Sequence, residues 1–184
     1  MDLRTERLLL RELEESDAAA CNEYESDPEV VRYQSAGVRT LEESLEYIRK
    51  SRESLLASPR QTFDFAVVLP GEDRLIGRAG IHVTDAEIRE GTIWYVLHPA
   101  QWGKGYIPEA MRALVDLGFG ELGLHRIFAD CDPGNVASAR VAEKLGMRRE
   151  AHFVENAWLK GQWVDSLIYA ILDREWLNRE WKAR

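Results

Sequence analysis

Hydrophobic positions along this chain recur with two different periods, and the switches between them predict a mixed α/β fold. Runs rich in β-branched and aromatic residues, bounded by turn residues, predict seven strands: 7–13, 63–69, 74–83, 91–98, 126–131, 152–159 and 162–172. Apolar residues three or four positions apart predict helices after Ser16, after Thr40, over 107–117, over 136–145 and in the tail 173–184. This order predicts a central, mostly antiparallel sheet flanked by helices.

Local signals fix several of the connections. The turn cluster at 70–73 joins two strands into a hairpin, and Lys160-Gly161 closes another. Thr40 with Glu43 forms a capping box. The order strand, helix, strand, helix after residue 91 predicts one parallel pairing. Four aromatic residues on or near the last hairpin are expected mainly in the core: Phe153, Trp158, Trp163 and Tyr169.

Length and composition predict one globular domain, residues 1–184. The chain has 184 residues, of which 45% are hydrophobic, with no internal repeat or linker. Its apolar runs are far shorter than the ~20 residues of a membrane-spanning helix. Cys21 and Cys131 lack metal-site or redox spacing, and four histidines show no metal-ligand pattern, so reduced thiols, no metal and a cytoplasmic location are expected.

The charge balance narrows the choice of partner. Twenty-four basic against 32 acidic residues give a net charge of −8, which argues against nucleic acid because phosphate binding needs a basic face. A cationic substrate such as an amine fits this sign better, although negative charge also serves solubility.

The most informative segment, 102–108, reads Trp-Gly-Lys-Gly-Tyr-Ile-Pro and stands where a helix begins. Its two glycines let the backbone turn tightly, so free amide N–H groups and the positive helix end would converge on an anion. The spacing fits neither a Walker loop nor a dinucleotide fingerprint. An anion cradle and a glycine loop without a ligand both remain open from these residues alone.

Several motifs together resemble the GCN5-related N-acetyltransferase (GNAT) superfamily, and within it the RimJ/RimL type, which acetylates N-terminal amines of ribosomal proteins. The resemblance covers nearly the whole chain and is carried by segments 5–11, 91–98, 98–110, 135–138 and 143–147. It implies the GNAT fold, with a seven-stranded mixed sheet, and a single acyl-CoA N-acyltransferase domain. It also implies acetyl-CoA as cofactor, an amine as substrate and a possible homodimer.

The resemblance also implies a cofactor site. The diphosphate of the coenzyme would lie on the amides from Gly103 to Ile107, and its pantetheine arm along the splayed fourth strand. A backbone N–H near Val96 or Leu97 would polarise the acyl carbonyl. The cofactor-binding residues expected on this basis are Tyr95, Val96, Leu97, Trp102, Gly103, Lys104, Gly105, Tyr106, Ile107, Asn135 and Ser138.

The chain departs from the wider superfamily in its catalytic groups. Ala142 stands where many relatives have a tyrosine acid, and a serine at the position of Ser138 is the proposed proton donor in the resembled branch. Strict alignment places the expected base at Ala157, so Glu155, two residues earlier on the same strand face, is the predicted base. Asn135 is expected to cap a helix and also to touch the cofactor.

A carboxylate base suits an α-amino group. At pH 7, deprotonating an amine with a pKa near 8 costs about 1 to 1.5 kcal/mol, whereas a lysine costs about 4.6 kcal/mol. The sequence therefore predicts acetyl transfer from acetyl-CoA to a protein or peptide N-terminus by direct attack. Two alternatives stay open: acetylation of a small amine (polyamine, amino acid or antibiotic), and a catalytically silent acyl-CoA-binding module.

Overall fold

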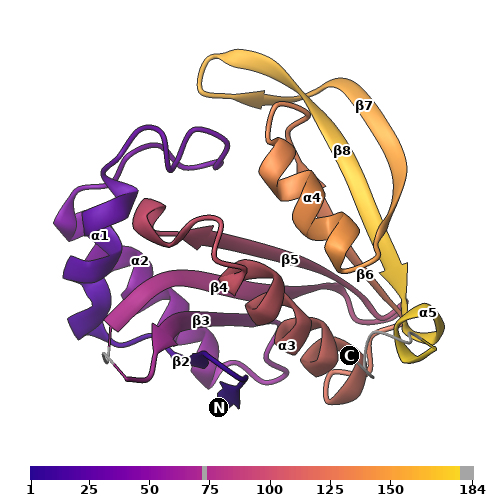
Figure 1. Cartoon of the computed structure of the whole chain (residues 1–184), viewed down its shortest axis with the longest axis horizontal. Helices are drawn as coiled ribbons and strands as arrows, with labels where there is room; N and C mark the ends of the chain where they lie inside the picture. Colours follow the sequence, from indigo (N-terminus) through magenta and orange to yellow (C-terminus); the bar gives the residue numbers. More distant parts are fainter. Residues whose placement is uncertain (72–73, 179–184) are drawn as a thin grey trace.

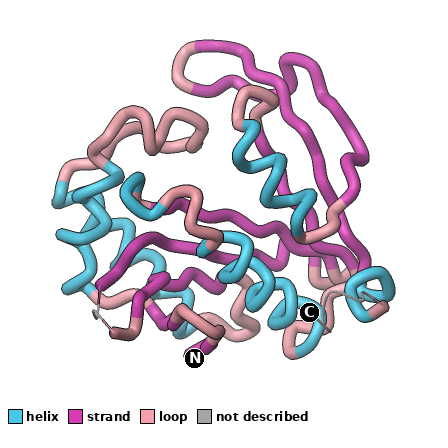
Figure 2. Tube along the Cα trace, viewed as in Figure 1, coloured by secondary structure: helices cyan, strands magenta, loops and turns pink. Residues whose placement is uncertain are grey.

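The computed structural model describes residues 1–71 and 74–178 and folds around one eight-stranded mixed sheet (Figures 1 and 2). The strands are β1 (Asp2–Arg4), β2 (Leu9–Glu12), β3 (Thr62–Leu69), β4 (Arg74–Asp85), β5 (Glu90–Leu97), β6 (Arg126–Cys131), β7 (Arg148–Leu159) and β8 (Gln162–Leu172). The α-helices are α1 (Ala18–Glu25), α2 (Leu41–Glu53), α3 (Tyr106–Gly120), α4 (Val136–Lys144) and α5 (Asp173–Leu177). The strands are ordered β1-β2-β3-β4-β5-β6-β8-β7.

The α/β fold class and the mostly antiparallel sheet are confirmed, but the sheet has eight strands and not the predicted seven. The additional strand is β1, whose three residues pair with β2 and are too few to show a period. The first predicted strand, 7–13, is also shorter in the structure, where β2 covers only Leu9–Glu12; the Arg7 amide donates to Glu109 of α3.

Helices cover both faces of the sheet, as Figure 1 shows. Helices α1 and α2 pack on one face through a cluster that includes Tyr24, Ile48 and Val96. Helices α3 and α4 pack on the other face in a larger cluster that includes Met111, Ala142 and Ile93. The capping box predicted at Thr40 is present, because its side chain accepts from the Glu43 amide and the Glu43 carboxylate accepts from the Thr40 amide. The observed N-terminus of α2 and the buried faces of the helices therefore both match the sequence pattern.

The sheet opens between β5 and β6. These strands form the predicted parallel pairing, but only Glu90–Thr92 of β5 pair with β6, opposite residues 126–128. Beyond Thr92, residues Ile93–Leu97 of β5 have no neighbouring strand on that side within the described chain. The resulting gap lies at the carboxyl ends of two parallel strands, which is where ligands bind in open α/β sheets.

The last hairpin differs from the expectation. Strands β7 and β8 extend past the body of the sheet at the top of Figure 1. Phe153, Trp158 and Trp163 are about half exposed there, at 49%, 58% and 58%, and only Tyr169 is buried. The prediction of a core position was wrong for these three, because none of the helices in the described residues covers the projecting part of the hairpin.

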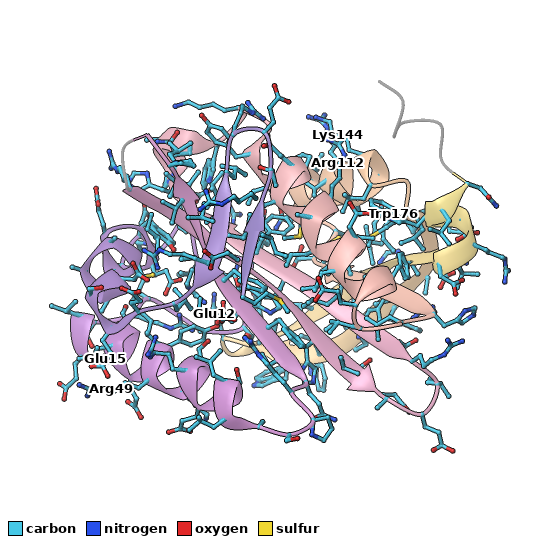
Figure 3. The ribbon with its side chains drawn as sticks, turned by 90° about the horizontal axis from the view of Figure 1, so that it is seen from below. Glu12, Glu15, Arg49, Arg112, Lys144 and Trp176 are labelled. Atoms are coloured by element: carbon cyan, nitrogen blue, oxygen red, sulfur yellow. The ribbon has the colours of Figure 1, made fainter. Side chains whose placement is uncertain are left out.

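The tail begins with the predicted helix. In α5, Trp176 is fully buried and its indole N–H donates to Asp116 of α3 at 2.7 Å. Figure 3 shows Trp176 between the two helices. The rest of the predicted tail helix, with Trp181, lies outside the described residues, as do Glu72 and Asp73 of the predicted turn. Among the described helices, none is long and apolar enough to cross a bilayer.

Candidate active site

A cleft of about 630 Å³ occupies the gap between β5 and β6. Its walls come from β5, the start of α3, the end of β6, α4 and the loop after α1. Ten of the eleven residues predicted to bind cofactor line it: Tyr95, Val96, Leu97, Trp102, Gly103, Gly105, Tyr106, Ile107, Asn135 and Ser138. The fold therefore brings together residues from three separate segments of the sequence.

The eleventh residue, Lys104, does not line the cleft. Its ammonium group donates to Gln101 Oε1 at 2.9 Å, and its carbonyl accepts from the Arg7 guanidinium at 3.1 Å. Its side chain thus braces the loop, and any contact with a ligand in the cleft would come from its backbone.

The start of α3 has the geometry expected of an anion cradle. Gly105 is the N-cap residue with φ 82°, and Gly103 has φ 76°. No side chain caps the helix. A Cβ at Gly103 would meet no atom within 4 Å, so there is room for a side chain. Glycine is favoured here because of the left-handed backbone conformation. The amides of the first turn have no acceptor within the helix and are available to an anion.

The first strand region holds this turn in place. Glu109, in the first turn of α3, accepts from the Thr5 hydroxyl at 2.5 Å and from the Arg7 amide and Nε at 2.8 and 2.7 Å. Burial raises the pKa of Glu109, but these hydrogen bonds outweigh it and leave the pKa below its usual value. The carboxylate therefore stays charged and anchors the N-terminal segment beside the cradle.

The unpaired edge of β5 faces the cleft. The Leu97 carbonyl accepts from Trp102 Nε1 at 2.8 Å, and the Tyr95 carbonyl accepts from Gln34 Nε2 at 3.4 Å. The His98 amide instead bonds to Ile76 of β4. Because N–H and C=O of one residue point to the same side of an antiparallel strand, the Leu97 amide is turned toward the cleft and the Val96 amide toward β4.

On the α3–α4 side of the sheet, Tyr95 and Ser138 meet. The Tyr95 hydroxyl donates to Ser138 Oγ at 3.0 Å. Burial raises the pKa of Tyr95 to about 12, so this hydroxyl keeps its proton. Asn135 is the N-cap of α4, as predicted, because its Oδ1 accepts from the Ser138 amide at 3.1 Å. Ser138 is therefore held from both its backbone and its side chain.

Asp130 lines the opposite side of the cleft. It alternates along β6 with Ile127, Ala129 and Cys131, which pack toward α3 and α4, so it projects to the α1–α2 side. Its Oδ2 accepts from the Ser166 hydroxyl at 3.4 Å. Partial desolvation raises the pKa of Asp130, and the Ser166 hydrogen bond only partly offsets this.

Glu155, the predicted base, is not among the residues that line the cleft. It lies in a bulge of β7 with φ 48°, and its amide donates to Asp165 at 2.9 Å. Glu155 is thus separated from the cleft residues that meet around β5.

The loop after α1 is in contact with the tip of the β7–β8 hairpin. Lys160, at the tip of the β7–β8 hairpin, donates from Nζ to the carbonyls of Val31 and Arg32 at 2.5 and 3.2 Å. Tyr33, on the same loop, donates to the Gly134 carbonyl at 3.1 Å. The loop after α1 is thus tied to both the hairpin and the start of α4.

Sequence reasoning missed several lining residues. Asp130 ends a predicted buried strand, and strand alternation would have placed it opposite the apolar positions. Arg140 and Lys144 also line the cleft and stand four residues apart on α4, two and six positions after Ser138. This helical spacing was a readable signal for a cationic wall. Figure 3 shows Lys144 at the end of α4.

The chain matches the family model described as "Acetyltransferase (GNAT) domain" over residues 7–148. It is 39% identical to the uncharacterized N-acetyltransferase YnaD of Bacillus subtilis strain 168 over 176 residues, covering 96% of this chain and 99% of YnaD. A more distant match is the [Ribosomal protein uS5]-alanine N-acetyltransferase of Escherichia coli K12, 27% identical over 115 residues, 62% of this chain and 59% of that protein.

Solved structures agree with the sequence matches. A GNAT-family acetyltransferase from Bacillus anthracis superposes with TM-score 0.85 at 38% identity, covering 95% of this chain and all of that one (100%). Spermidine N-acetyltransferase from Vibrio cholerae, solved in complex with CoA and spermine, has the same fold: TM-score 0.81, 22% identity, coverage 95% of this chain and 100% of that chain.

Proposed function

The chain belongs to the GNAT family of acetyl-CoA-dependent N-acetyltransferases, and we propose that its acceptor is the α-amino group of a protein or peptide N-terminus. One observation carries the choice of acceptor. Among the described residues the cleft offers carboxylates as bases but no histidine. A carboxylate is a weak base, which suits an α-amine with a pKa near 8 far better than a polyamine or lysine near 10.4.

The residues of the cleft fit the coenzyme. The amides from Gly103 to Ile107 would hold its diphosphate, because they lie at an uncapped helix start with two left-handed glycines. Arg140 and Lys144 add positive charge on the same side of the cleft. The free edge of β5 offers the Leu97 amide to an extended arm. When bound, acetyl-CoA supplies an acetyl group as a thioester, which an amine attacks directly.

Three groups of this chain would then act on protons and charge. Asp130 accepts a proton from the acceptor's ammonium group, directly or through water, and so frees the nitrogen lone pair. The Leu97 amide donates a hydrogen bond where negative charge develops on the acyl oxygen. Ser138 would give its hydroxyl proton to the sulfur as the new C–N bond forms and the C–S bond breaks, and would regain a proton, directly or through water, from the nitrogen as the amide forms. We assign the base role to Asp130, because Glu155 lies outside the cleft lining.

Further expectations from the sequence belong to this proposal. The RimJ/RimL resemblance is supported by the match to the uS5-alanine N-acetyltransferase. A single acyltransferase domain, a homodimer and a cytoplasmic location remain predictions.

The test is release of free thiol from acetyl-CoA with a panel of acceptors. The panel contains peptides with a free N-terminus, the same peptides blocked at the N-terminus, polyamines and free amino acids. We expect release with the free peptides, and acetylation mapped to the α-amine by mass spectrometry. Preferred acetylation of polyamines would assign the enzyme to small amines. Tight coenzyme binding without release for any acceptor would identify a silent binding module.

A further inference from the structure

We propose that a second cavity, on the α1–α2 side of the sheet, binds a carboxylate that the acceptor carries close to its amine. The inference rests on the proposed function, since it concerns the acceptor of the same reaction. The cavity has a volume of about 330 Å³. It shares the lining residues Gln34, Trp94 and Val96 with the main cleft, so the two cavities are neighbours at β5.

The position of the cavity suits an acceptor. Trp94 and Val96 alternate along β5 with Tyr95, whose side chain bonds to Ser138 on the α3–α4 side. The second cavity is therefore on the face opposite Ser138 and on the same face as Asp130. An acceptor that enters from this side meets β5 with its amine beside the proposed base. The rest of the acceptor then extends under the loop after α1.

The charged groups at the cavity are arranged around Glu25. Glu25 is 2% exposed, and both of its oxygens are already bound. Oε1 accepts from Arg78 Nε at 2.9 Å and from Arg78 Nη2, and Oε2 accepts from Arg39 Nη1 at 2.6 Å. Glu25 is therefore not available to pair with the ammonium group of a polyamine.

Arg39 retains unused donors, because its Nε and Nη2 make no hydrogen bond within the described residues. Nη1 of Arg78 has no hydrogen-bond partner either, but it lies 3.6 Å from Asp64 Oδ2 and forms an ion pair with that carboxylate. Both guanidinium groups stack on the ring of Tyr47, at 4.3 and 4.1 Å from its centroid, which fixes their orientation. Arg39 is the more accessible, with its side chain 19% exposed against 5% for Arg78.

The side chains that line the cavity include more basic than acidic groups, although the whole chain carries a net charge of −8. The lining holds two arginines and one glutamate. Asp64, the other buried acid nearby, does not line the cavity; it pairs with Arg78 Nη1 at 3.6 Å and accepts from Tyr47 and Ser51 hydroxyls at 2.6 and 3.0 Å. Arg39 is therefore the arginine that can bind a ligand. A guanidinium with free N–H groups matches the planar geometry of a carboxylate. The acceptor chemistry that fits is an amine with a carboxylate a few bonds away.

Two acceptors share this chemistry: a peptide with Asp or Glu at its N-terminus, and the free acidic amino acid. The experiment measures kcat/KM for acetyl transfer to peptides that begin with Asp or Glu and to matched peptides that begin with Asn or Gln. Free glutamate and glutamine amide form a parallel pair, because free glutamine would still carry an α-carboxylate next to its amine. Each pair differs only in the exchange of carboxylate for carboxamide groups of nearly the same shape.

The wild-type enzyme is expected to prefer the carboxylate member of a pair by about tenfold or more. The variant R39M should bring this ratio close to one. R49M is the matched control, because Arg49 is an exposed arginine on α2 that pairs with Glu15 (Figure 3) and should leave the ratio unchanged. Circular dichroism checks that each variant is folded, and the wild-type ratio stands as a test without any variant.

The outcomes test the carboxylate site and the proposed acetyltransferase function separately. A preference only among free amino acids supports the carboxylate site and overturns the peptide acceptor. Equal transfer to both members of every pair overturns the carboxylate site and leaves the acetyltransferase proposal standing. Absence of transfer to any amine overturns both.

Discussion

Tyr95 on β5 and Ser138 on α4 are joined by a 3.0 Å hydrogen bond in which the tyrosine hydroxyl is the donor. Because Tyr95 donates, the proton of Ser138 remains available for a third partner. The pair stands in the cleft, close to where the chain has Ala142 and many superfamily members have a tyrosine acid. Ala142 itself is buried in the core and cannot serve. We therefore assign proton delivery to Ser138 and its positioning to Tyr95.

Replacement of Ser138 with alanine should lower kcat about 10²-fold, the lower range for loss of a general acid. Y95F should lower kcat less, because Ser138 keeps its proton but loses the partner that orients it. Steady-state kinetics with a peptide acceptor measures both. A purely structural role for Tyr95 would lower the stability of Y95F and leave kcat of the folded variant at the wild-type value. An S138A enzyme with wild-type kcat would remove Ser138 from the mechanism.

D130N should lower kcat/KM strongly, while E155Q should leave it near the wild-type value. Asp130 acts in its deprotonated form, and its pKa is raised above the usual aspartate value. Activity of the wild type should therefore fall as the pH is lowered through that raised pKa, and this acid limb should vanish in D130N. The pH dependence of kcat/KM for both variants tests the assignment. The reverse result, with E155Q impaired and D130N normal, would restore Glu155 as the base.

The features of the site that depend on one short segment could be predicted from the sequence. The Gly103 and Gly105 turn, the Asn135 cap and the parallel β5–β6 pair were all readable, because each depends on residues close together or on a regular period. Glu155 was chosen by its distance along a strand. A bulge between Phe153 and Ala157 interrupts the alternation of side chains between the two faces of β7. No pattern in the local sequence predicts this bulge.

Substitution G105V should weaken coenzyme binding by tenfold or more. Gly105 has φ 82°, a conformation that a β-branched residue avoids, so the turn would reorganise and its amides would no longer converge. The matched control is G120A at the other end of α3, where an added Cβ meets no atom within 4 Å. Calorimetric titration with CoA measures the affinities. Unchanged affinity in G105V would contradict the placement of the diphosphate.

E25Q should lower the free energy of unfolding by about 3–5 kcal/mol, because it removes the carboxylate that pairs with the buried Arg78 most closely and leaves only Asp64, at 3.6 Å, to balance the guanidinium charge. E15Q removes an exposed carboxylate that pairs with Arg49 at 2.9 Å and should leave stability unchanged, since water screens that pair. Urea denaturation of both variants provides the comparison. Equal stability of E25Q and wild type would mean that the buried network contributes little to folding.

The cavity on the α1–α2 side of the sheet could not be predicted from the sequence. Glu25, Arg39 and Arg78 are separated by up to 53 residues, lie on a helix, a loop and a strand, and meet only through the packing of α1 and α2 on the sheet. Lys160 contacts the loop after α1 although it lies 129 residues from Val31 in the sequence. Such contacts depend on the tertiary fold and leave no periodic trace.

The most direct test of the account is a crystal structure of the protein with CoA bound. The account predicts the diphosphate on the amides of residues 103–107, and the pantetheine arm along the free edge of β5 between Tyr95 and Ser138 on one side and Asp130 on the other. Coenzyme bound elsewhere, with the start of α3 free of phosphate, would contradict it.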